Sequence, residues 1–235
     1  MRFEYIKSDI KDPYRNLAFE ECLTDHVYPG YGILFLWQNE NTIVVGRNQD
    51  VYSECNVSDF KLTGGKIARR RSGGGAVYHD AGNLNYSIIS AASDLERCRY
   101  QDIAGRALSF LQIPFEFNGR NDLITKGRKF SGNASYRLGE AVVQHGTLLI
   151  ESDTDKMERF LTPDRSKLAR NHVHSAGSRV IGLKEVSERV SIESLSEGLI
   201  RAVSAESFNG SMDDEKLTEL TRFYSGDEWI YGGKR

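Results

Sequence analysis

The stretch from Arg69 to Asn83 constrains this chain more than any other, because three arginines run directly into Ser72 and three glycines between two strand-like segments. Glycine permits a positive φ and lets a ligand approach main-chain N–H groups, which flanking arginines would offer to an anion. The run therefore predicts a phosphate cradle. It matches neither a P-loop nor a G-x-G-x-x-G helix opening. On the residues alone, a flexible glycine hairpin is an equal alternative.

Composition indicates an ordinary globular protein. The 235 residues are 39% hydrophobic and carry a net charge of −2, so basic and acidic residues nearly balance and the composition does not favour nucleic-acid binding. We find no apolar run typical of a signal peptide or a membrane span, and we expect a cytoplasmic protein that does not bind membranes. Cys22, Cys55 and Cys98 lack C-x-x-C spacing, which predicts free buried thiols. His172 and His174 have no nearby carboxylate or cysteine to complete a metal site.

Periodicity predicts strands in the first part of the chain, with two helices among them. Apolar positions at helical spacing indicate helices over 16–24 and about 100–112. The runs 33–37 and 42–46 flank a polar turn and predict a hairpin. Further strands are expected at 67–71, 76–80 and 84–89, so that the glycine run joins two strands.

A second hairpin is predicted over 122–125 and 128–136, around Lys126-Gly127. Alternation would place Lys129, Ser131 and Asn133 on one face of its second strand, and Phe130 with Ala134 on the other. The polar face is either one wall of a site or simply solvated. A long apolar strand follows at 141–150, where we expect His145 to be a hydrogen-bonded core residue.

The last third of the chain has helical patterns, over 153–162, about 191–205 and about 213–224. Ser191 is suited to cap the second of these helices. Neither repeats nor a Pro/Ser-rich linker divides the sequence. The pattern predicts one α+β domain with mixed and antiparallel sheets flanked by helices.

Four motifs, taken together and in order, resemble the lipoate-protein ligase A family, and the resemblance covers nearly the whole chain. The motifs are Arg69-Arg70-Arg71-Ser72-Gly73-Gly74-Gly75-Ala76-Val77-Tyr78-His79-Asp80-x-Gly82-Asn83, Gly119-Arg120-Asn121-Asp122-Leu123, Arg128-Lys129-x-Ser131-Gly132-x-Ala134 and His145-Gly146-Thr147-Leu148-Leu149. Asn16-Leu17-Ala18-x-Glu20-Glu21 and Gly46-Arg47-Asn48-Gln49 are also similar to that family. Their agreement favours the cradle over the flexible hairpin.

The resemblance implies a biotin/lipoate ligase-like fold and a two-step reaction. Lipoate and ATP would give lipoyl-AMP and pyrophosphate, and a lysine of an acceptor domain would then displace AMP. Charge stabilisation by arginine, lysine and main-chain N–H groups suits this crowded anionic chemistry. The implied catalytic residue is Lys129. The implied nucleotide and lipoyl-AMP site comprises Arg70, Ser72, Gly73, Gly74, Gly75, Ala76, Val77, Tyr78, Asn83, Asn121, Asp122 and Lys129. The implied lipoate site comprises Arg70, Ser72, Lys129 and His145, and Asp122 is the implied ligand of Mg²⁺.

The resemblance leaves the reaction partners open. It implies a catalytic domain over 1–235 without the small C-terminal accessory domain of many members, so a separate accessory protein could be needed for adenylation. The implied acceptors are the E2 subunits of 2-oxoacid dehydrogenases or a glycine-cleavage H-type protein. A lipoyl or octanoyl transferase of the same fold is the alternative, although we find no cysteine after Cys98, where its nucleophile would be expected. A non-catalytic acyl or nucleotide binder is the third possibility.

Overall fold

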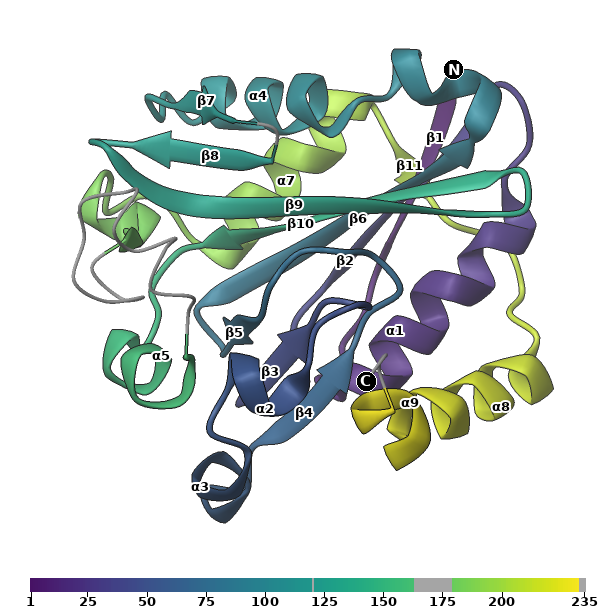
Figure 1. Ribbon diagram of the computed structural model, residues 1–235. Coiled ribbons are helices and arrows are strands. Elements are labelled where there is room, and N and C mark those ends of the chain that lie inside the picture. The colour runs from purple at the N-terminus through teal and green to yellow at the C-terminus, as the bar shows by residue number, and fades with distance from the viewer. Residues whose placement is uncertain (120, 163–178, 233–235) are drawn as a thin grey trace.

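The computed structural model describes residues 1–119, 121–162 and 179–232, which form two sheets with helices packed around them (Figure 1). The larger sheet has eight strands in the order β11-β1-β2-β6-β10-β9-β8-β7, and the smaller has the order β4-β3-β5. The strands of the larger sheet are β1 (Arg2–Lys7), β2 (Tyr31–Trp37), β6 (Asn83–Ala91), β7 (Glu116–Asn118), β8 (Asp122–Thr125), β9 (Arg128–Leu138), β10 (Ala141–Leu149) and β11 (Glu206–Ser207). Those of the smaller sheet are β3 (Thr42–Val45), β4 (Lys66–Arg69) and β5 (Val77–His79).

The helices cover both faces of the larger sheet (Figure 1). The α-helices are α1 (Pro13–Cys22), α2 (Val51–Glu54), α3 (Val57–Leu62), α4 (Tyr100–Phe110), α5 (Thr154–Phe160), α7 (Ile192–Val203), α8 (Asp214–Ser225) and α9 (Asp227–Tyr231). Short 3₁₀ helices are η1 (Leu23–His26), η2 (Ala92–Arg97) and η4 (Leu183–Glu185). Ser191 accepts from the Ser194 N–H and caps α7, as predicted. The α+β fold expected from the sequence is confirmed.

Three groups of buried side chains form the core. Leu34, Ile88, Ile103 and Leu199 belong to a cluster that joins the larger sheet to α4 and α7. Leu17, Ile33, Ile89 and Leu217 belong to a second cluster, under α1 and α8 on the other face. Ile43, Phe60, Phe160 and Ile230 belong to a third, around the smaller sheet. Alternate residues of β2 and β6 thus face opposite clusters, because successive strand side chains point to opposite faces.

The predicted hairpin of 33–37 and 42–46 is wrong, because its two strands belong to different sheets. β2 pairs with β1 in parallel and with β6 in antiparallel fashion. β3 instead lies between β4 and β5. All seven residues of β2 and all four of β3 are buried, so each strand can be a central strand of its own sheet. The glycine run therefore joins the two outer strands of the smaller sheet.

The β8–β9 hairpin forms as predicted, but a β-bulge changes which way its side chains face. Leu123 pairs with Ser131 whereas Ile124 pairs with Lys129, which leaves Phe130 as an extra residue in β9. A bulge shifts the alternation by one residue. The prediction that Lys129 shares a face with Ser131 and Asn133 is consequently wrong.

The contacts of Asn133 and Lys129 show the two faces directly. The Tyr86 hydroxyl donates to Asn133 Oδ1, and Asn133 Nδ2 donates to Ser131 Oγ, on the side of the α4–α7 core. A Cβ on Gly132 would instead lie 2.8 Å from Lys129 Nζ. Lys129 is thus on the α1 face, over Gly132.

Two of the three arginines in the 69–71 run hold the C-terminal helices in place. Arg69 is 1% exposed and donates to five main-chain carbonyls, those of Gly46, Arg47, Gln49, Trp229 and Ile230. The Arg71 guanidinium donates to the Glu21 carboxylate and lies over the rings of Phe223, Tyr224 and Trp229. These two cations therefore stabilise the fold, whereas Arg70 lines a cavity.

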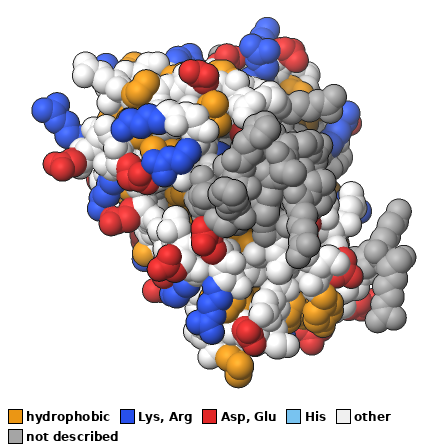
Figure 2. All heavy atoms as spheres, turned by 60° about the vertical axis from the view of Figure 1, so that its left-hand side comes forward, with side chains coloured by type: hydrophobic (Ala, Val, Ile, Leu, Met, Phe, Trp, Pro, Cys, Tyr) orange, Lys and Arg blue, Asp and Glu red, His pale blue; other side chains and the backbone are white. Residues whose placement is uncertain are grey.

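The surface shows no concentration of one charge on the face drawn in Figure 2, where Lys and Arg side chains are interspersed with Asp and Glu. Within the described part of the chain, the helices are too short or too polar to cross a bilayer.

Candidate active site

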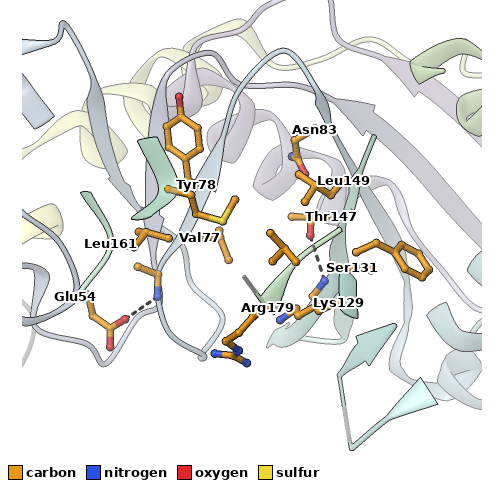
Figure 3. A pocket seen from close by; sticks show the side chains of 15 residues that line it. Glu54, Val77, Tyr78, Asn83, Lys129, Ser131, Thr147, Leu149, Leu161 and Arg179 are labelled. Atoms are coloured by element: carbon orange, nitrogen blue, oxygen red, sulfur yellow. Dashed lines mark hydrogen bonds between the residues drawn. The ribbon is translucent and has the colours of Figure 1, made fainter. Parts of the chain in front are cut away.

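Two adjoining cavities lie between the smaller sheet and the end of the larger sheet that carries Lys129. Their volumes are about 140 Å³ and about 280 Å³. Both are lined by Glu54, Ala76, Val77, Lys129, Gly132, Thr147 and Arg179. The side chain of Lys129 therefore lies where the two cavities meet, and a group bound in either one can contact it. Figure 3 shows it among the residues of the smaller cavity.

Lys129 forms an ion pair with Asp122 from the neighbouring strand. Lys129 Nζ lies 2.7 Å from Asp122 Oδ1, and each side chain is 29% exposed. Asp122 is paired with Gly132 across the strands, directly beside the bulge. The bulge thus delivers the ammonium group to the cavity next to a carboxylate.

Arg70 closes the glycine turn from inside. Its Nη2 donates to the carbonyls of Gly73 and Gly75, its Nη1 donates to the carbonyl of Val44, and its Nε donates to Ser72 Oγ. Burial lowers the pKa of Arg70 to about 10, so it stays charged at neutral pH. In a planar trans peptide the C=O and N–H point in opposite directions. The Gly74 N–H, in the same peptide as the Gly73 carbonyl, is therefore directed away from Arg70.

Gly74 has a φ of +95°, which glycine adopts without strain. A Cβ there would lie 2.8 Å from Arg70 Nη2. The sequence predicts that glycine is needed in this turn so that phosphate can approach the main chain. The structure gives two further reasons for glycine at position 74, namely its positive φ and the nearby Arg70 guanidinium.

Ser72 and His145 belong to a buried chain of hydrogen bonds that ends at Glu20 on α1. Ser72 Oγ and His145 Nε2 are 2.6 Å apart, and His145 Nδ1 lies 3.0 Å from Glu20 Oε2. Ser87 and Tyr136 also donate to the Glu20 carboxylate. His145 lines the larger cavity, whereas Ser72 is 1% exposed and lies behind it. This chain connects Arg70 to the helix beneath the sheet.

The smaller cavity is mostly apolar and lies beside the start of β5. Besides the shared residues it is lined by Tyr78, Asn83, Phe130, Ser131, Leu149, Met157, Leu161 and Val180. The Ala76 N–H donates to Glu54 Oε2 at 2.8 Å (Figure 3). The ring of Tyr78 points away from Lys129 (Figure 3) and packs edge-on against Phe60. Tyr78 therefore contributes mainly its backbone to this wall, and burial raises the pKa of its hydroxyl to about 12.

The structure brings most of the sequence-predicted site residues to these two cavities. Arg70, Gly73, Gly74, Gly75, Ala76, Val77, Tyr78, Asn83, Asn121, Asp122, Lys129 and His145 line one or both. Ser72 is the exception, because it lies behind the wall.

Sequence reasoning missed several cavity residues: Leu17, Trp37, Glu54, His79, Asn85, Thr147 and Arg179. Thr147 follows His145 by two positions in β10, so the alternation of that strand would have indicated it. Glu20 stood in a quoted motif without a role, and its contact with His145 depends on tertiary packing.

A metal site has little support from protein ligands alone. Within residues 1–119, 121–162 and 179–232, the structure contains no cluster of three His, Cys, Asp or Glu side chains able to hold a metal. His172 and His174 lie outside the described residues. Asp122 is the carboxylate nearest Lys129, and a single carboxylate fits Mg²⁺ only where substrate phosphates supply further ligands.

The fold, with its mixed sheet flanked by helices, is that of the lipoate ligases. A bipartite lipoate protein ligase from Thermoplasma acidophilum, solved in a study that includes its E2 lipoyl domain, has a TM-score of 0.81 at 25% identity, covering 100% of this chain and 97% of that one. LipL1 of P. falciparum, in complex with lipoate, has a TM-score of 0.81 at 25% identity, over 99% and 75% of the two chains.

Sequence comparison agrees with the structure. The family model described as lipoyl protein ligase A/B catalytic domain matches residues 12–204. A probable lipoate-protein ligase A of Mycoplasma pneumoniae is 39% identical over 97% of this chain and 71% of its own length. The chain belongs to the lipoyl protein ligase A/B catalytic domain family.

Proposed function

We propose that this protein activates lipoate with ATP to form lipoyl-AMP, and then transfers the lipoyl group to a lysine of an acceptor protein. The observation that carries this proposal is the position of Lys129 at the junction of two cavities. An enzyme that joins two substrates needs one charge-stabilising group within reach of both. The enzyme class, an ATP-dependent lipoate-protein ligase, follows from the family and from the curated relatives.

In the first step, a lipoate carboxylate oxygen attacks the α-phosphorus of ATP, a P–O bond to the carboxylate forms, and the bond to pyrophosphate breaks. Lys129 would lie next to both anions and offset their repulsion. Mg²⁺ would arrive with the nucleotide, with Asp122 as the protein carboxylate available to it, and would neutralise phosphate charge. The remaining residues of this chain bind and orient the substrates.

The two cavities suggest where each substrate lies. The nucleotide would occupy the smaller one, along Ala76, Val77, Tyr78 and Asn83, with its phosphates near Asp122 and Lys129. The acyl chain would occupy the larger one, past Arg70 and His145. Ser72 would act on both only through Arg70 and His145, which it contacts.

In the second step, the amine of an acceptor lysine attacks the acyl carbonyl of lipoyl-AMP, an amide bond forms, and AMP leaves. A ligase of this class has lipoyl acceptor proteins as partners. We propose an E2 lipoyl domain or a glycine-cleavage H-type protein as the acceptor. We also propose that residues 1–235 act as a catalytic domain that carries out both steps, with a separate accessory protein for adenylation as the alternative, since the similar ligase from Thermoplasma acidophilum is bipartite.

The structure disfavours a transferase that carries the acyl group on a cysteine. Cys22, Cys55 and Cys98 are buried, and none lines either cavity. Burial raises the pKa of both Cys22 and Cys55 to about 11, which lowers the thiolate fraction that a nucleophile requires.

One assay tests the proposal. The purified chain is incubated with ATP, Mg²⁺ and lipoate, with and without an apo acceptor domain, and lipoyl-AMP, pyrophosphate and the acceptor mass are measured. We expect lipoyl-AMP without acceptor and a lipoylated lysine with it. Transfer from chemically made lipoyl-AMP, without adenylation, would indicate that an accessory protein is needed. Binding without either step would contradict the proposal, and a thioester on this chain would favour the transferase.

A further inference from the structure

The junction of the two cavities contains the carboxylate of Glu54 as well as cations. Three charged side chains among the described residues line both cavities, those of Glu54, Lys129 and Arg179. The two cations suit the nucleotide phosphates and the lipoate carboxylate, which meet here in the proposed first step. A carboxylate at the same place repels both anions. The position of Glu54 therefore calls for a cationic partner that these two substrates do not supply.

The fold holds the Glu54 carboxylate in place by one of its two oxygens. Glu54 is the last residue of α2 and is partly exposed. Its Oε2 accepts from the Ala76 N–H at 2.8 Å, whereas Oε1 has no hydrogen-bond or salt-bridge partner among the described residues. In Figure 3, Glu54 and Lys129 lie on opposite sides of the cavity, with Arg179 between them. Oε1 is thus left to a ligand, on a carboxylate whose orientation is already fixed.

Mg²⁺ and the acceptor lysine are the two cationic participants in the proposed reaction. Mg²⁺ takes several oxygen ligands in octahedral geometry and arrives with the phosphates, where Asp122 is the carboxylate proposed for it. Over the ranges that the structure describes, Glu54 belongs to no cluster of three potential metal ligands. A lysine ammonium needs only one carboxylate oxygen, and it must reach the acyl carbonyl of lipoyl-AMP where the nucleotide and acyl cavities meet. The free oxygen of Glu54 therefore fits the lysine better than the metal.

We propose that Glu54 binds the acceptor lysine and accepts a proton from it during transfer, an inference that rests on the proposed function. The bound ammonium loses one proton to water and attacks the acyl carbon of lipoyl-AMP as the neutral amine. The C–N bond forms, and the C–O bond to AMP breaks with its electron pair leaving on AMP. The second nitrogen proton passes to Glu54 Oε1 and from there to water. A positioned carboxylate is a common general base for such a step.

The test measures transfer alone, from chemically made lipoyl-AMP bound to an excess of the whole chain, to an apo E2 lipoyl domain. Glu54→Gln keeps an oxygen for the Ala76 N–H but removes the charge and the proton acceptor. We expect it to slow lipoylation of the domain by about 10²-fold, the scale of a general base. Glu140→Gln is the matched control, because Glu140 lies in the β9–β10 turn and its side chain is 90% exposed. It should transfer at the wild-type rate.

Hydroxylamine supplies a second nucleophile for the same bound lipoyl-AMP. It is uncharged at neutral pH, and its nitrogen loses a proton to water readily, so it needs no carboxylate. We expect hydroxamate formation by Glu54→Gln to stay within a few-fold of the wild type. The same reaction shows that the variant is folded and binds lipoyl-AMP.

Three results would overturn the inference. Normal lipoylation by Glu54→Gln, with slow lipoylation by Glu54→Ala, would show that the carboxylate acts only by holding the Ala76 N–H. Equal losses with hydroxylamine and with the acceptor domain would indicate a role in binding lipoyl-AMP. A loss of pyrophosphate release from ATP and lipoate as large as the loss of transfer would assign Glu54 to the metal or the nucleotide.

The wild type separates this inference from the function on which it rests. A wild type that transfers nothing from lipoyl-AMP to the domain would contradict the proposed function, and this inference with it. A wild type that transfers, beside a Glu54→Gln variant that transfers equally fast, would contradict this inference alone.

Discussion

Lys129 Nζ and Asp122 Oδ1 lie 2.7 Å apart on paired strands, at the point where the two cavities meet. The carboxylate holds the ammonium group in place before substrates bind. A phosphate or carboxylate that enters must replace or share this partner. The pair is partly exposed, so solvent screens it and the exchange need not be costly.

Replacing Lys129 by alanine should reduce lipoyl-AMP formation by about 10²-fold or more, because a single charge-stabilising donor contributes on that scale. Pyrophosphate release with lipoate and ATP is the measurement. Lys126→Ala is the matched control, since Lys126 lies in the adjacent turn, is exposed and donates only to the Glu185 carbonyl among the described contacts of its side chain. Near-normal turnover in Lys129→Ala would show that Lys129 is not required for the catalytic step.

Gly74→Val should weaken ATP binding strongly, because the glycine turn runs directly into Ala76 and Val77, which line the smaller cavity. Valine is strained at a φ of +95°, and its Cβ would displace the Arg70 guanidinium that holds the turn closed. Gly73→Ala is the comparison, because a Cβ there meets nothing within 4 Å and φ is not positive, so its effect should be clearly smaller. Calorimetry with ATP gives both affinities. Unchanged affinity in Gly74→Val would show that the turn does not contact the nucleotide.

Arg69→Leu should lower the free energy of unfolding by about 3 kcal/mol or more, because five buried or partly buried carbonyls lose a charged donor. Urea unfolding followed by tryptophan fluorescence measures the loss. Arg47→Ala, an exposed side chain in the loop that Arg69 holds, should change stability by less than about 0.5 kcal/mol. Similar losses in the two variants would mean that the Arg69 contacts contribute little.

The neutral state of His79 predicts a pH effect on stability. Its pKa is about 3 when folded against 6.5 unfolded, so below pH 6.5 the unfolded chain binds more protons and stability falls with pH down to about 3. This group contributes a slope of at most about 1.4 kcal/mol per pH unit. His79→Gln should lose less stability between pH 7 and pH 5 than the wild type, in urea titrations at both values. Equal losses of stability in the wild type and in His79→Gln would show that another group causes the pH dependence.

The residues of the glycine run indicated where the site lies, but not what each residue does there. Arg69, Arg70 and Arg71 look alike in the sequence, which does not distinguish an anion-binding arginine from a structural one. Only tertiary packing separates them, because the carbonyls at Trp229 and Ile230 and the rings of Phe223 and Tyr224 come from a distant part of the chain.

Local periodicity likewise predicted most helices and strands of the fold. It failed where the pairing of a strand depends on residues distant in the sequence. β1 went unpredicted because in it only Phe3 and Glu4 are buried, and Glu4 is satisfied by the Tyr31 hydroxyl on β2. The runs 33–37 and 42–46 looked like a hairpin because nothing in either run specifies its sheet. His79 and Asn85 gave no signal, since both line the larger cavity only because β5 and β6, from two different sheets, pack near each other.

The extra residue in β9 has a consequence for any change in chain length nearby. Removing Phe130 would restore regular pairing with β8, and the side chain now directed over Gly132 would rotate toward the opposite side of the sheet. The residue types would then be unchanged while the ammonium group left the place where the substrates meet. Deletion of this single residue would therefore abolish catalytic activity although no charged residue is removed.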